Sequence, residues 1–181
     1  MPGVIDYSVV LPRLRERGFI SLYHNSGAFG FPADAQVTSI GWLEADDPTI
    51  RPAARSLVRR VESIEKLLPQ ALERIAGDAW LMPKSHWHYE LHFGNRELLE
   101  ALLPRLGIDP AMLRDRNDGS AIEFSTQKRD LLKQAVREML GALVGSDFSI
   151  VFADAATVCT IHHHRQLWWQ TTDKSIAAVA S

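Results

Sequence analysis

The stretch FSIVFADAATVCTI, residues 148–161, contains the strongest indication of the fold. Apolar residues occupy both sets of alternating positions in residues 148–152, so we expect a central strand. The small residues ADAA (153–156) predict a tight reversal into a last strand. That strand begins near Thr157 and is expected to run through the histidines to Trp169, which makes a C-terminal hairpin.

A second stretch, HWHYELHF (residues 86–93), alternates between aromatic or apolar and titratable side chains. Successive side chains on a strand point to opposite faces, so this alternation predicts a strand with one aromatic face and one titratable face. A strand with helices on both sides would be apolar throughout. We therefore expect the helices to cover only one face of the sheet.

Helical periodicity accounts for most of the remaining chain. We expect a short helix starting near Ser8, a long helix over 48–76 that is kinked or broken near Pro69, and helices over 95–106 and 126–143. Further strands are expected over 19–24, 37–43 and 121–124, the first two forming an N-terminal hairpin. The order αββαβαβαββ predicts an α+β fold with a mixed or mostly antiparallel sheet.

Length and composition indicate one folded domain. The chain has 181 residues, of which 46% are hydrophobic and 23% are charged, values typical of globular proteins. We assign residues 1–174 to this domain and expect a frayed tail over 175–181.

Charge and cysteine content exclude several classes of protein. A net charge of −2 gives no overall attraction to nucleic acid, and the densest basic run (Arg51, Arg55, Arg59 and Arg60) is expected to be the solvated face of the long helix. One cysteine, Cys159, excludes an intramolecular disulfide and a multi-cysteine zinc site. No apolar run reaches the roughly 20 residues that span a bilayer, and the first residues do not resemble a secretory signal. We expect a soluble, cytoplasmic protein.

Six of the seven histidines lie in two segments, residues 86–92 and 162–164, and this clustering points to a metal site. Neutral imidazole is a common ligand of zinc and other divalent transition metals. Alternate residues of a strand share a face, so the predicted ligands, if the two segments are neighbours, are His86, His88, His162 and His164. His92 is expected to lie too far along its strand, and His163 to point away. Glu90 is the candidate catalytic base acting on metal-bound water.

Two alternatives need no metal. Clustered imidazoles that titrate near pH ~6.5 would form a pH-sensitive patch. The aromatic residues would form a recognition surface, because Trp and Tyr are enriched at binding hot spots. This ligand-binding set comprises Tyr23, Phe29, Phe31, Trp168 and Trp169. Trp168 and Trp169 are adjacent and point to opposite faces of a strand, so one is expected in the core and the other is expected to be exposed.

The leading functional hypothesis from the sequence is a binding or regulatory domain that uses a face near the two histidine segments. Its partner would be a small molecule or a protein, and base rates favour a homodimer over other oligomers. The alternative is a metal-dependent hydrolase, with zinc as the cofactor. The two hypotheses differ because a hydrolase needs converging titratable groups and an open coordination position.

Overall fold

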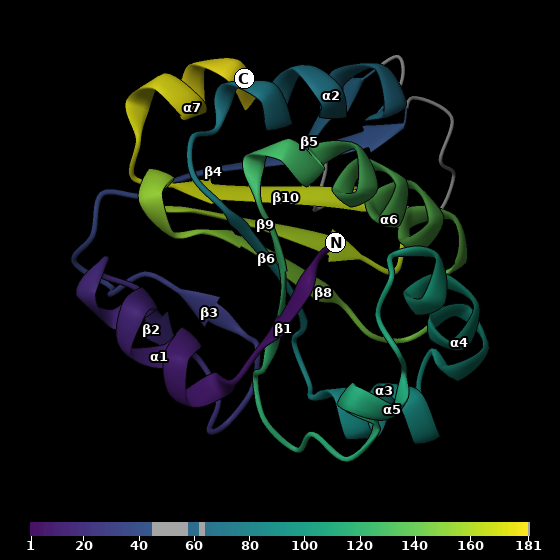
Figure 1. Cartoon of the computed structure of the whole chain (residues 1–181). Coiled ribbons are helices and arrows are strands. Elements are labelled where there is room, and N and C mark those ends of the chain that lie inside the picture. The colour runs from purple at the N-terminus through teal and green to yellow at the C-terminus, as the bar shows by residue number, and fades with distance from the viewer. Residues whose placement is uncertain (45–57, 62–63, 181) are drawn as a thin grey trace.

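The computed structural model describes residues 1–44, 58–61 and 64–180 (Figure 1). Its main sheet contains β1 (Gly3–Ile5), β4 (Thr38–Glu44), β5 (Val58–Val61), β6 (Ala79–Pro83), β7 (Ala121–Phe124), β8 (Phe148–Phe152), β9 (Thr157–His162) and β10 (Gln166–Thr171). These strands lie in the order β1-β7-β6-β8-β9-β10-β4-β5. All neighbouring pairs are antiparallel except β4 and β5. The expected α+β fold, with a mixed and mostly antiparallel sheet, is confirmed.

The helices are α1 (Tyr7–Glu16), α2 (Ile64–Arg74), α3 (Trp87–His92), α4 (Arg96–Arg105), α5 (Ala111–Arg114), α6 (Arg129–Ala142) and α7 (Lys174–Ala180), with short 3-10 turns at Thr126–Lys128 and Ala153–Ala155. The expected helices near Ser8, over 95–106 and over 126–143 correspond to α1, α4 and α6. No helix in the described ranges combines the length and apolar character that crossing a membrane requires.

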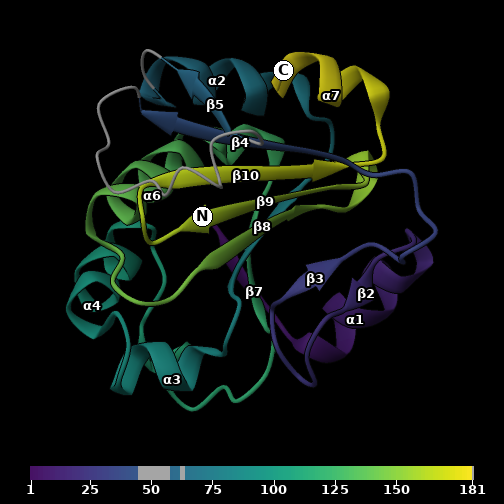
Figure 2. The same ribbon diagram turned by 180° about the vertical axis from the view of Figure 1, so that it is seen from behind.

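Two hydrophobic clusters cover opposite faces of the sheet. The larger one joins α2, α3, α4, α6 and α7 to alternate residues of the strands, such as Ile150 and Phe152 of β8. The smaller one joins α1 to the other face, where Val151 of β8 and Val158 of β9 are buried. A separate pair of strands, β2 (Ile20–Ser21) and β3 (Phe29–Gly30), lies beside α1 (Figure 2). Most helices therefore share one face as expected, and α1 adds partial cover to the second.

The prediction of a strand over residues 86–93 is wrong, because this segment forms α3. Trp87 and Leu91 are four residues apart, a spacing that fits both an alternating strand and one face of a helix, and both are buried. On a strand, Tyr89 and Phe93 would share the buried face of Trp87 and Leu91. They are instead 44% and 74% exposed, as expected for the helix. His86 has an extended backbone and accepts a hydrogen bond from the Tyr89 N–H through its side chain, so it caps the helix.

The expected long helix over 48–76 is also wrong in its middle part. Residues 58–61 form β5, whose backbone pairs with β4, and the helix begins only at Ile64. Pairing with a neighbouring strand thus overrides the local helical period. Pro69 lies inside α2, which continues to Arg74 rather than ending near Leu68. The predicted helix start near Pro48, with Arg51 and Arg55, lies outside the described residues.

Three further predictions for the ends of the chain are corrected. The strand over 37–43 does not pair with the strand over 19–24, because β4 pairs with β10 and β2 pairs with β3. The expected single C-terminal strand is two strands, β9 and β10, joined by a turn. The segment expected to be a frayed tail forms α7, which is held to the sheet through the buried Ile176.

Candidate functional site

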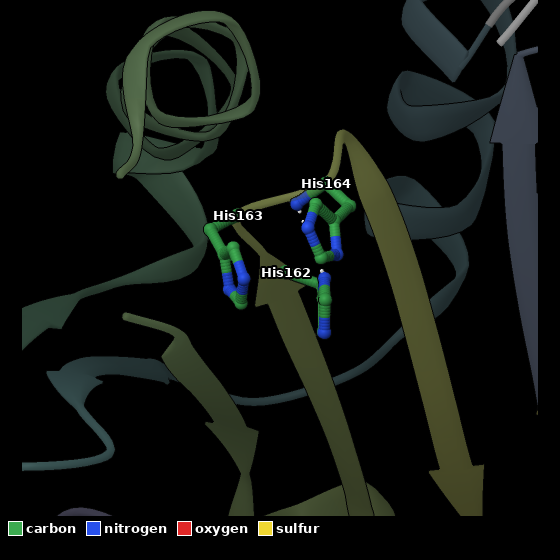
Figure 3. A group of neighbouring side chains, drawn as sticks. All are labelled: His162, His163 and His164. Carbon is green, nitrogen blue, oxygen red and sulfur yellow. Dashed lines mark hydrogen bonds between the residues drawn. The ribbon is translucent and has the colours of Figure 1, made fainter. Parts of the chain in front are cut away.

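The three consecutive histidines lie at the hairpin turn between β9 and β10. His162 pairs with Gln166, so His163, His164 and Arg165 form a three-residue loop, and Arg165 adopts the positive φ of 57° that such loops require at their last position. The turn ends the alternation of the strand and brings the three imidazoles together (Figure 3). The ring centroids of His162 and His163 are 4.4 Å apart, and those of His163 and His164 are 4.2 Å apart. The expectation that His163 points away is therefore wrong.

Asp147, immediately before β8, orients this group of histidines. Its Oδ1 lies 2.8 Å from His163 Nδ1 and accepts a hydrogen bond from the His163 backbone N–H at 3.2 Å. Its Oδ2 lies 4.0 Å from His162 Nε2. A carboxylate that is hydrogen-bonded to one ring nitrogen of a histidine fixes the tautomer of the ring. Because Asp147 faces Nδ1 of His163, the lone pair of Nε2 is left to bind a cation.

The electrostatics of the turn favour a neutral His162. Burial lowers the pKa of His162, Asp147 opposes this shift, and His163, His164 and Lys84 add to it. His162 Nδ1 accepts a hydrogen bond of 3.1 Å from the His164 backbone N–H, so in the neutral ring the proton is on Nε2 and the Nδ1 lone pair already has a donor. A metal ion bound at Nδ1 would replace this N–H donor.

The histidines whose metal-ligand atoms lie close together come from the same sequence segment. In the described part of the chain, the ligand atoms of His162, His163 and His164 all lie within 4.8 Å of one another, and a second such group consists of His88, His92 and Asp115. The predicted set of His86, His88, His162 and His164 does not appear as one group among the described residues. His86 and His88 belong to α3, whereas His162 and His164 belong to the β9–β10 hairpin.

Glu90 is fully buried and forms the centre of a hydrogen-bond network. Its Oε1 accepts from Ser85 Oγ at 2.7 Å. Its Oε2 accepts from Asn95 Nδ2 at 2.9 Å, from the Asn95 backbone N–H at 3.3 Å and from Ser146 Oγ at 2.9 Å. Asn95 Oδ1 in turn accepts from the Val144 N–H at 2.8 Å. The network ties α3, the start of α4 and the segment before β8 together, which is the environment of a structural carboxylate rather than of a base that reaches water.

The aromatic residues of the predicted recognition surface have different environments. Trp169 and Phe29 are buried in the two clusters, and Phe31 packs against Phe19 with ring centroids 4.8 Å apart. Tyr23 is 69% exposed. Trp169 is the member of the adjacent pair that lies in the core, whereas Trp168, the member then expected to be exposed, is half-buried.

Trp168 is the member of that set nearest to the histidine turn along the chain. Its Nε1 donates to Gln166 Oε1 at 2.8 Å, and Gln166 pairs with His162 across the hairpin. Its ring covers Gly41, where an added Cβ would lie 2.9 Å from the indole. The tryptophan therefore packs beside the hairpin and is held in one orientation.

Sequence reasoning missed Asp147, Asp115 and Ser146. Asp147 is adjacent to the predicted central strand, so a correct placement of the β9–β10 turn would have put it opposite His162. Asp115 and Ser146 offer no local signal, because only tertiary packing brings each of them to its partners.

Comparison with protein-family models, curated proteins and solved structures gives no match for this chain.

Proposed function

We propose that this protein is a binding domain whose β9–β10 hairpin holds a divalent transition-metal ion, with zinc as the ion that best fits its ligands. The observation that carries the proposal is the convergence of three imidazoles, with ligand atoms within 4.8 Å of one another, on a turn oriented by Asp147. Zinc–imidazole bonds of about 2.0–2.1 Å in a tetrahedral site place ligand nitrogens roughly 3.3 Å apart. The three ligand atoms, which lie within 4.8 Å of one another, would have to draw closer to reach that spacing.

The site would leave room for further ligands of the ion. His164 is exposed and His162 and His163 are half-buried, so the triplet lies at the surface of the molecule. Three protein ligands and a fourth position open to water or a further ligand would allow binding or catalysis, since catalytic zinc sites have this arrangement. We favour binding because Glu90, the base predicted for the hydrolase alternative, has both oxygens occupied by protein donors.

Isothermal titration of untagged, EDTA-treated protein with zinc chloride tests the proposal. We expect binding at the hairpin to be lost when His162, His163 and His164 are all replaced by Gln. Replacing Asp147 by Asn should weaken it about 10–100-fold, the usual effect of removing a carboxylate that orients a metal-binding histidine. His24→Gln is the matched control, because His24 is exposed and belongs to neither group.

An unchanged zinc isotherm in the triple variant would refute the proposal. The same conclusion would follow if the wild-type protein bound less than a tenth of an equivalent. Thermal unfolding of each variant without metal verifies that the fold is retained.

A further inference from the structure

We infer that the protein has a second, independent site for a divalent transition metal, formed by His88 and His92 of α3 and by Asp115 at the end of α5. The ligand atoms of these three residues lie within 4.8 Å of one another. Two imidazoles and one carboxylate form a set that binds zinc or ferrous iron and leaves coordination positions open to solvent. This site does not depend on the hairpin site.

Helix geometry brings the two histidines together. His88 and His92 are four residues apart and therefore lie on the same side of α3, with ring centroids 4.4 Å apart. The sequence had predicted that His92 lies too far from His88 along a strand to share an ion, and the helix removes that separation. The backbone N–H of His88 donates to the Arg116 carbonyl at 2.9 Å, which fixes α3 against the segment that carries Asp115.

The carboxylate of Asp115 has no competing partner among the described residues. The arginines on either side of it in the sequence bind elsewhere: Arg114 pairs with Glu100 at 3.0 Å, and Arg116 pairs with Asp6. Asp115 is therefore an exposed carboxylate next to two imidazoles, and neither of the flanking arginines forms an ion pair with it in the described structure.

An unsatisfied nitrogen provides an independent reason to expect a ligand. His88 Nδ1 is buried and has no hydrogen-bond partner in the described part of the chain. A buried polar atom without a partner costs about 1–3 kcal/mol, and such atoms in folded proteins often mark an ion or a water site. A cation bound by this group would join α3 to α5 and would stabilise the protein in proportion to its concentration.

The experiment uses the variant in which His162, His163 and His164 are replaced by Gln, so that the hairpin does not contribute. Titration of this protein with zinc chloride is expected to show one equivalent, and titration with cobalt(II) chloride a matching visible absorption band. Adding His92→Gln or Asp115→Asn should weaken binding at least about tenfold. Both residues are exposed, so both substitutions are expected to leave the fold intact.

Matched controls are His24→Gln for the histidine and Glu97→Gln for the carboxylate, since each is an exposed residue outside the group. The inference is overturned if the hairpin variant binds no equivalent of zinc. It is also overturned if His92→Gln and Asp115→Asn both bind as tightly as their controls. Failure of the hairpin proposal would look different: the wild-type protein would then bind a single equivalent, and His92→Gln would abolish it.

Discussion

Replacement of Glu90 separates its structural role from the catalytic role that the sequence had suggested. Four donors face its two oxygens: Ser85 Oγ, Ser146 Oγ, and the backbone and side-chain N–H groups of Asn95. In Glu90→Ala, the two serine hydroxyls can turn toward water or other acceptors because both serines are only half-buried. The two N–H groups of Asn95 that face Glu90 lose their acceptor in the buried interior, and Nδ2 keeps only its bond of 2.7 Å to Ser146 Oγ.

The expected loss of unfolding free energy in Glu90→Ala follows from the two hydrogen bonds that these Asn95 donors lose. Each hydrogen bond to a charged group contributes about 1.5–3 kcal/mol, so losing two corresponds to about 3–6 kcal/mol of unfolding free energy. Glu90→Gln keeps the volume and one acceptor oxygen, and its amide group can donate to Ser85 Oγ. We therefore expect a smaller loss of about 1–2 kcal/mol for this substitution.

Urea unfolding followed by tryptophan fluorescence measures both values, with the exposed Glu97→Gln as the control. A loss below about 0.5 kcal/mol for Glu90→Ala would refute the reasoning, because a fully buried hydrogen-bonding centre cannot be removed at so small a cost. Unchanged zinc affinity in Glu90→Gln is expected as well, since Glu90 belongs to neither histidine group.

Two other substitutions test local features of the fold. A Cβ at Gly94 would lie 2.4 Å from Glu90 Oε2, so Gly94→Ala should destabilise the protein by about 1–3 kcal/mol in urea unfolding, and by clearly less when Glu90 is also Ala. Asp173 Oδ1 accepts from the backbone N–H and the side chain of Ser175 at the start of α7, and Asp173→Ala should cost about 1 kcal/mol. These bonds hold the pKa of Asp173 below its ordinary value. The stability difference between wild type and Asp173→Asn should therefore be complete above the ordinary aspartate pKa and shrink as the pH falls below it; a difference that grows on acidification would contradict this assignment.

The sequence alone determined the elements whose signal is local and unambiguous. Residues 148–152, apolar at every position except Ser149, form the central strand β8, and the small residues after it do form the reversal into β9. The helices α4 and α6 follow a helical period long enough to exclude a strand. In each of these segments only one regular structure, a strand or a helix, buries the apolar side chains. Packing against neighbouring elements therefore does not change the structure that the local pattern predicts.

Tertiary structure decided the segments in which two periods fit equally well. Trp87 and Leu91 fit one face of a strand and one face of a helix, and the helix that forms places the Glu90 carboxylate among donors from residues as distant as Ser146. The same holds for the candidate sites. Clustering of histidines in the sequence drew attention to both regions, but a turn and a helix, rather than two adjacent strands, determine which imidazoles meet. The carboxylates beside them, Asp147 and Asp115, reach the histidines only because packing brings separate elements together, and a linear pattern contains no information about that packing.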